Sequence, residues 1–143
     1  MLTLTAEAEA VMQAVVAMGL LSLVMFVWMY ATRLPAFKAA NIAPQDAAHP
    51  GTYTLPSKVA RVADNYNHLF EAPTLFYAIA IATVVVGQAD GMTAILAWTY
   101  VGLRIAHSLV QATINIVTLR FTLFALGWLA LGAMIVRVAL ALF

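Results

Sequence analysis

Long apolar stretches dominate the chain, and polar residues interrupt them at only a few places. Crossing the hydrocarbon core of a bilayer, ~30 Å thick, takes about 20 helical residues. The pattern predicts helices of at least this length over residues 10–31, 57–86, 92–119 and 121–143. The first contains no charged residue, and the last contains only Arg137. We therefore predict an all-α protein, an integral membrane four-helix bundle that forms a single domain over residues 1–143.

The predicted helices are joined by segments with the composition of loops. Residues 32–56 form the longest connection, which contains Pro35, Pro44, Pro50 and Pro56. Proline and glycine interrupt helices and strands, so this segment is predicted to be irregular rather than a fifth helix. The short connection at residues 87–91 begins and ends with glycine, which predicts a turn between antiparallel helices.

The composition agrees with a membrane location. Of 143 residues, 64% are hydrophobic and only 9% are charged, whereas about a quarter of a soluble domain is charged. The net charge of +1 gives no reason to expect a nucleic-acid partner. The chain has no cysteine, which excludes disulfides and thiolate metal ligands. Any thiol chemistry would need a thiol supplied from outside.

The charges near the helix ends predict the orientation. The segment before the first helix carries Glu7 and Glu9 but no basic residue, so we expect this helix to be retained rather than cleaved as a signal peptide. Basic residues prefer the cytoplasmic side of a membrane. They gather around the 32–56 loop and the third connection: Arg33, Lys38, Lys58, Arg61 and Arg120. We expect a bacterial-type inner-membrane protein with this loop in the cytoplasm and both termini outward.

The second and third predicted helices each carry a polar stripe. At 100° per residue, each set of polar side chains falls within an arc of about 100–120°. The stripe on helix 57–86 consists of Arg61, Asp64, Asn67, His68 and Glu71. The stripe on helix 92–119 consists of Arg104, His107, Ser108, Gln111 and Asn115. We predict that the two stripes face each other in a polar seam.

The depth of the two stripes predicts which side chains meet. At 1.5 Å per residue, Glu71 lies about 20 Å from the start of its helix and Arg104 about 22 Å from the end of the next. An unpaired charge at that depth costs at least ~2.5–3.5 kcal/mol. We therefore predict a Glu71–Arg104 ion pair, with His68 opposite His107. Pro73 predicts a bend in the helix just past Glu71.

Structural roles for these residues remain open at this point. A buried ion pair can simply fix the register of two helices. His68 and His107 can form hydrogen bonds in the core or ligate haem or a metal, and we favour the former because a metal site needs a third matched ligand. No metal is expected. For Asn67 and Gln111, hydrogen bonds between helices are the simplest interpretation.

Two segments are similar to a known family. Residues 61–76 (RVADNYNHLFEAPTLF) resemble the second-helix motif of the MAPEG proteins, membrane-associated proteins in eicosanoid and glutathione metabolism. That motif has an Arg, an Asn, a Glu and a Pro in this order. Residues 104–108 (RIAHS) resemble the third helix of the prostaglandin synthase branch. Arg120 falls where that branch has a functional arginine.

The resemblance implies a homotrimer that binds glutathione as a co-substrate in cytoplasm-facing clefts between subunits. Membrane lipid and a small lipophilic substrate would be the other partners. Arg120 would be the catalytic residue, because a nearby cation lowers the pKa of a thiol and holds the reactive thiolate. The residues expected to bind glutathione are Arg61, Asn67, His68, Glu71, Arg104, His107 and Gln111.

Two functional hypotheses follow from this resemblance. The first is a glutathione-dependent transferase or peroxidase that acts on lipophilic electrophiles. The second is a non-catalytic lipid-binding or scaffold protein of the same fold. Gln111 and Phe121 favour the second, because they stand where the family's enzymes have a tyrosine and a serine.

Overall fold

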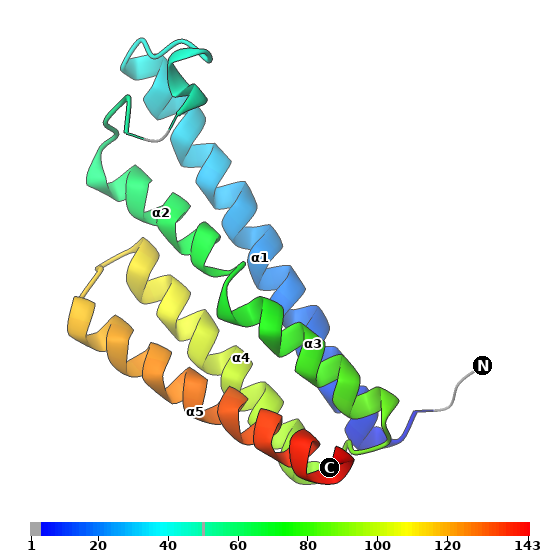
Figure 1. Cartoon of the computed structure of the whole chain (residues 1–143). Coiled ribbons are helices and arrows are strands. Elements are labelled where there is room, and N and C mark those ends of the chain that lie inside the picture. Colours follow the sequence, from blue (N-terminus) through cyan, green and yellow to red (C-terminus); the bar gives the residue numbers. More distant parts are fainter. Residues whose placement is uncertain (1–3, 50) are drawn as a thin grey trace.

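The computed structural model describes residues 4–49 and 51–143. Its long helices lie side by side and alternate in direction along the chain (Figure 1). The elements are α1 (Ala6–Ala39), the short 3-10 helix η1 (Asp46–Ala48), α2 (Ser57–His68), α3 (Ala72–Val85), α4 (Gly91–Ala112) and α5 (Val117–Leu142). Four stretches are long and apolar enough to cross a membrane: Ala6–Ala39, Ser57–Val85, Gly91–Ala112 and Val117–Leu142. The predicted set of four membrane helices is confirmed.

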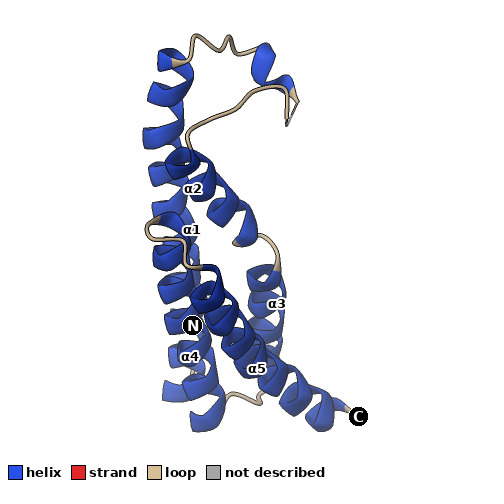
Figure 2. Ribbon diagram, turned by 90° about the vertical axis from the view of Figure 1, so that its left-hand side faces the viewer, coloured by secondary structure: helices blue, strands red, loops and turns tan. Residues whose placement is uncertain are grey.

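α4 lies at the centre of the bundle. It packs against α1, α2 and α5, while α3 packs against α1 and α5. Figures 1 and 2 show that α1 and the α1–α2 loop extend well past the turn that joins α4 to α5. The start of α2 therefore projects beyond that turn, and the middle of α2 lies at its level.

The first helix is longer than predicted. It begins after Thr5, whose side chain accepts a hydrogen bond from the N–H of Ala8 at 3.2 Å, as an N-cap does. It then continues through Pro35 to Ala39, so the predicted loop of 32–56 is wrong for its first eight residues. The apolar pattern marks the stretch that fits in the bilayer, and the helix runs on past it.

The second predicted helix is broken rather than bent. α2 ends at His68 and α3 begins at Ala72, with Glu71 between them in a non-helical conformation (φ −94°, ψ −107°). Pro73 lies in the first turn of α3, where the missing N–H costs no helical hydrogen bond. Proline thus starts a new helix here.

The third predicted helix ends earlier than residue 119. α4 stops at Ala112, and Asn115 has a left-handed backbone (φ +54°), which asparagine tolerates better than most residues. Its N–H donates to the carbonyl of Val110 at 2.7 Å and closes the end of the helix. Asn115 is therefore not part of the α4 stripe, and Arg120 lies in the first turn of α5.

The apolar core and the outer surface are built from the same kinds of residue. Inside, Phe76 of α3 stacks on Tyr100 of α4 with ring centroids 4.6 Å apart. Outside, large apolar side chains such as Val24 and Leu129 are exposed, the latter by 70%. Such a surface would be costly in water and suits a lipid environment.

Candidate functional site

The buried face of α4 carries a row of polar side chains. Arg104 and His107 are 2% and 3% exposed, and Ser108 and Gln111 are equally buried. They follow one another at helical spacing on one face of α4, where Arg104 and His107 approach His68 of α2. The predicted stripe on this helix is confirmed from Arg104 to Gln111.

Arg104 caps the broken end of α2. Its Nη2 donates to the carbonyl oxygen of His68 at 2.9 Å. Because α2 ends at His68, this carbonyl lacks the N–H of a continued helix and accepts instead from the N–H of Glu71 at 3.4 Å. The C-terminal end of a helix also attracts a cation. The arginine thus adds a second, shorter hydrogen bond to a carbonyl at the helix break.

The predicted Glu71–Arg104 ion pair is wrong for the described chain. The side chain of Glu71 is 62% exposed, and its Oε2 lies 3.6 Å from Nδ1 of His68. The reason is the break: Glu71 leaves the helical path, so an angle extrapolated from Arg61 does not apply to it. Among the residues that the structure describes, Asp90 forms an ion pair with Arg137, whereas His68 and Glu71 would form one only with the imidazole protonated.

The polar stripe of α2 is divided between two directions. Asn65 is fully buried against the bundle, and Arg61 and His68 are half-buried. Asp64 and Asn67 are exposed. Only part of the predicted stripe faces α4, and the rest lies on the outside of the single chain.

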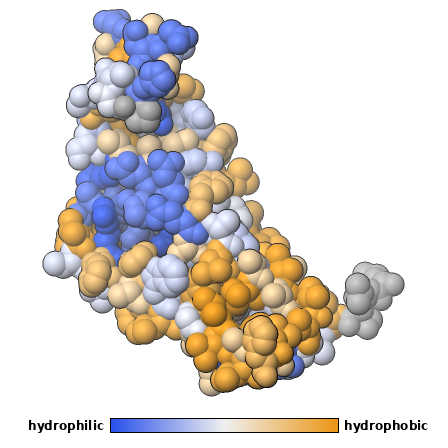
Figure 3. All heavy atoms as spheres, viewed as in Figure 1, coloured by the Kyte–Doolittle hydropathy of each residue, from blue (hydrophilic) through white to orange (hydrophobic). Residues whose placement is uncertain are grey.

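The exposed part of α2 borders a pocket beneath the α1–α2 loop. Asp64 and Asn67 line this pocket, which has a volume of about 400 Å³, together with Arg33 and Tyr53. Arg33 donates a hydrogen bond to the hydroxyl of Tyr53, which fastens the loop to α1. Figure 3 shows a hydrophilic patch on this face, above a mostly apolar lower half.

His68, His107 and Arg120 come together around one cavity. It has a volume of about 210 Å³ and is completed by Val117, Phe121 and Phe124. The two imidazole centroids lie 6.3 Å apart, as the depth argument predicts for these two residues. Nη1 of Arg120 donates to Oδ1 of Asn115 at 2.6 Å, which holds the guanidinium at the cavity. Three of the predicted site residues thus meet, from α2, α4 and α5.

The remaining predicted residues do not line this cavity. Asn67 and Glu71 are exposed, Arg61 is half-buried on α2, and Gln111 lies one turn beyond His107 on α4. Of these, Gln111 alone is fully buried. The structure therefore gathers Arg120, His68 and His107 most closely, with Arg104 directly behind His68.

Unpartnered buried polar atoms concentrate in the same region. A buried donor or acceptor without a partner costs about 1–3 kcal/mol. All such side-chain atoms found in the described part of the chain belong to α2, α4 and the first turn of α5. They are Arg61 Nε, Asn65 Nδ2 and Oδ1, His68 Nδ1, Tyr100 Oη, Arg104 Nε, His107 Nδ1, Ser108 Oγ, Gln111 Oε1 and Arg120 Nε. This cluster fits a site that a polar ligand or a neighbouring subunit completes.

Sequence reasoning missed Asn65 and Tyr100. Asn65 falls about 40° from Arg61 on the helical wheel, so a slightly wider arc includes it. Tyr100 precedes Arg104 by four residues and therefore lies on the same face of α4. Both signals were present in the pattern, but an uncharged side chain beside apolar neighbours does not stand out.

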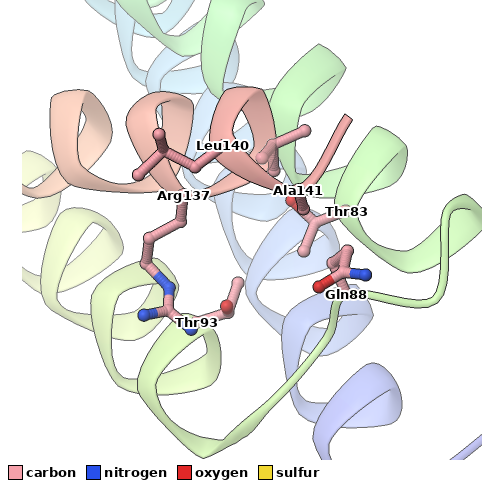
Figure 4. Close-up of a pocket in the computed structure, with 7 residues that line it drawn as sticks. Thr83, Gln88, Thr93, Arg137, Leu140 and Ala141 are labelled. Atoms are coloured by element: carbon pink, nitrogen blue, oxygen red, sulfur yellow. The ribbon is translucent and has the colours of Figure 1, made fainter. Parts of the chain in front are cut away.

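A second polar pocket lies at the opposite end of the bundle. It has a volume of about 280 Å³, and Arg137 of α5 reaches over it toward Thr93 of α4 (Figure 4). Asp90 accepts hydrogen bonds from the N–H and the hydroxyl of Thr93, both at 2.8 Å, and from Arg137 at 2.5 Å. These hydrogen bonds hold the pKa of Asp90 below its ordinary value of 3.8. The bond from the Thr93 N–H has the largest effect, and the Thr93 hydroxyl and Arg137 add to it. Because these charges are paired, the cluster serves to join the α3–α4 turn to α5.

The fold and the site define a four-helix integral membrane protein with a cavity near one end that is lined by two histidines, an arginine and apolar side chains. The chain belongs to the MAPEG family: the family's model matches residues 11–140. Comparisons with curated proteins and with solved structures gave no match. Within the described residues, no group of three or more His, Cys, Asp or Glu side chains is arranged to hold a metal ion.

Proposed function

We propose that this protein is a glutathione-dependent transferase or peroxidase that acts on lipophilic electrophiles. The family includes glutathione transferases and peroxidases as well as other members. The observation that carries the proposal is the cavity of His68, His107 and Arg120, which joins a cation to a set of unpartnered buried polar atoms. Its other walls, Phe121 and Phe124, are apolar and suit a lipophilic second substrate.

The charges of the site match those of glutathione. This tripeptide carries two carboxylates, an amine and a thiol. Arg61 and Arg104 each have an unpartnered buried Nε and supply positive charge for the carboxylates, while Glu71 supplies negative charge for the amine. Arg120 stands at the cavity, where its guanidinium would hold the thiolate, the reactive form of the thiol.

The outer stripe of α2 supports a cleft between subunits. Asp64, Asn67 and Glu71 are exposed on the single chain, yet they belong to a stretch that is long and apolar enough to span a membrane. Ionisable groups in that setting face a bundle interior or an aqueous cavity rather than lipid. A second copy of the chain opposite this stripe, as in a homotrimer, would create a cleft into which glutathione fits.

The distribution of basic residues supports an opening toward the cytoplasm. Arg33 and Lys38 near the end of α1, Lys58 at the start of α2 and Arg120 at the start of α5 all lie at the same end of the bundle. Such residues accumulate on the cytoplasmic side. The termini would then face outward, in a bacterial inner membrane.

A calorimetric titration of the purified protein with glutathione tests the proposal. We expect saturable binding, and conjugation of glutathione to a chlorinated aromatic by the same preparation. S-methylglutathione is the matched control, since it keeps the charges and lacks a thiol: it should bind without being consumed. Absence of turnover with several electrophiles would contradict the enzymatic proposal.

Binding without turnover, or no binding, would instead favour a non-catalytic lipid-binding or scaffold protein. An apolar groove of about 480 Å³ gives that alternative a physical basis. It runs along α1, where Met12, Val16 and Leu20 line it, and Trp98 of α4 closes it. A lipid chain would fit such a groove whether or not the polar cavity performs chemistry.

A further inference from the structure

His68 occupies a particular position between a carboxylate and the cavity. It is the last residue of α2, and Glu71 follows it in the break. Nδ1 of His68 lies 3.6 Å from Oε2 of Glu71. No hydrogen bond joins the two groups in the described chain, because 3.6 Å exceeds hydrogen-bond distance and Nδ1 has no partner. A negative charge this close favours, by electrostatic attraction, the neutral tautomer with the proton on Nδ1 and the lone pair on Nε2.

The surroundings of His68 hold the residue in place from three sides. Arg104 of α4 binds its carbonyl oxygen at 2.9 Å, and His107 of α4 faces its ring at 6.3 Å between centroids. Arg120 of α5 lines the same cavity. On α2 itself, the other charged side chains are Lys58, Arg61 and Asp64. The His68 ring is thus near the anionic Glu71 and shares its cavity with the cationic Arg120.

The cavity offers few groups that can accept a proton. Arginine stays protonated at all ordinary pH values, so Arg120 can stabilise an anion but cannot act as a base. His68 and His107 are the titratable residues besides Arg120 in the lining. His107 is 3% exposed, whereas the side chain of His68 is 38% exposed and has a carboxylate oxygen 3.6 Å from its Nδ1. A base, a carboxylate beside it and an anion-stabilising cation are the groups that activate a nucleophile.

We infer that His68 is the general base that deprotonates the thiol, with Glu71 as the residue that positions it; this rests on the proposed function. The S–H bond breaks and its proton moves to Nε2 of His68, while the thiolate lies beside the Arg120 guanidinium. The sulfur then forms a bond to the carbon of the chlorinated aromatic as the C–Cl bond breaks and chloride leaves. His68 returns its proton to water, so the net products are the thioether, chloride and a proton.

The rate–pH profile of the full-length protein in nanodiscs tests this inference, with saturating glutathione and a chlorinated aromatic. General-base catalysis contributes about 10²–10⁴-fold, so we expect His68→Gln to lower kcat by that factor while KM for glutathione changes little. The acid limb of the rate–pH profile of His68→Gln should move to higher pH. The thiol must then ionise without a base, and the pKa of a free cysteine thiol is ~8.5. Glu71→Gln should also lower kcat, by a smaller factor than His68→Gln.

Two controls separate a base from a structural residue. Added imidazole should restore part of the activity of His68→Ala, since the small molecule can occupy the vacated space and accept the proton. His49→Gln, in the exposed loop, should leave the profile unchanged. Thermal unfolding of each variant establishes that it is folded.

The possible results are distinguishable. If the wild type turns over and folded His68→Gln keeps its rate and acid limb, the inference is overturned and the proposed function stands. A second result also overturns the inference: His68→Gln weakens glutathione binding by as much as it lowers kcat/KM, and imidazole restores no activity to His68→Ala. His68 would then contribute only to glutathione binding. A wild type that never consumes glutathione overturns both.

Discussion

Nη2 of Arg104 donates to the carbonyl oxygen of His68 at 2.9 Å, and this bond ties the central helix to the break between α2 and α3. The break exists because Pro73 starts a new helix and Glu71 leaves the helical path. The His68 carbonyl thereby loses its helical partner, and it accepts from the Glu71 N–H at 3.4 Å and from the guanidinium. A residue that sequence reasoning assigns to an ion pair therefore binds the backbone of His68.

The first prediction concerns this capping bond. Arg104→Met keeps most of the apolar stem of the side chain but removes the shorter of the two hydrogen bonds to the carbonyl of His68, and leaves only the one from the Glu71 N–H. Hydrogen bonds from charged groups contribute about 1.5–3 kcal/mol, so unfolding in detergent should become easier by roughly that amount. Lys38→Met, on an exposed residue near the end of α1, is the control and should change stability by less than ~0.5 kcal/mol. Equal stabilities for the two variants would contradict the capping role.

The fold was predictable from the sequence because the bilayer limits it to a few elements. A stretch of about 20 apolar residues has one stable form in hydrocarbon, so the four helices could be recognised. Their ends could not, because ends depend on local backbone chemistry rather than on hydropathy. Asn115 in its left-handed conformation and Glu71 outside the helical region each end a regular segment that the apolar pattern would continue.

The site was predictable in composition but only partly in geometry. The depth rule brought His68 and His107 together correctly, because both lie on regular helix up to those positions. It failed for Glu71, which lies three residues further, beyond the end of α2. Arg120 reached the cavity from the first turn of α5 rather than from the predicted connection between the third and fourth helices, because the turn at Asn115 lets α5 begin earlier than the apolar pattern shows.

A second prediction concerns Arg120. If its guanidinium holds the thiolate, Arg120→Gln should lower kcat/KM for the chlorinated aromatic by ~10²-fold or more, as the removal of one charge-stabilising donor does elsewhere. Arg137→Gln is a matched control, since it removes the same charge from the other end of the same helix. Steady-state kinetics on both variants, corrected for the folded fraction, give the comparison. A similar loss in the two variants would indicate a general electrostatic effect and not a catalytic role.

Acidification should weaken the cluster at the opposite end of the bundle. The pKa of Asp90 lies below its ordinary value of 3.8 because Thr93 and Arg137 donate hydrogen bonds to the carboxylate. A carboxyl with a lowered folded-state pKa stabilises the protein fully above the ordinary pKa and loses this contribution as pH falls through the folded-state value. Thermal unfolding should therefore show a larger gap between wild type and Asp90→Asn at pH 6 than at pH 3. A gap that does not narrow on acidification would show that the charge of Asp90 is not what stabilises the turn.

Asn65 and Asn67 offer a matched test of burial on α2. Asn65 is fully buried, and neither atom of its amide has a partner among the described residues, whereas Asn67 is exposed. Because an unpaired buried amide costs about 1–3 kcal/mol, Asn65→Leu should raise the midpoint of thermal unfolding, and Asn67→Leu should not. A destabilised Asn65→Leu would mean that the amide has a polar partner in the assembled protein, such as a neighbouring subunit.

The absence of cysteine makes the chain suitable for testing whether the exposed side of α2 borders water. Asn67→Cys and Leu129→Cys each place a single thiol on an exposed position of a membrane-length helix. If Asn67 lines an aqueous cleft, its thiol can ionise and should react with a charged, water-soluble maleimide in nanodiscs, more slowly when glutathione is bound. The thiol at Leu129 should stay protonated in hydrocarbon and react at least ~10-fold more slowly, because only the thiolate is a good nucleophile. Equal, slow labelling at both positions would mean that α2 is sealed from water, and the proposed cleft between subunits would then have to be abandoned.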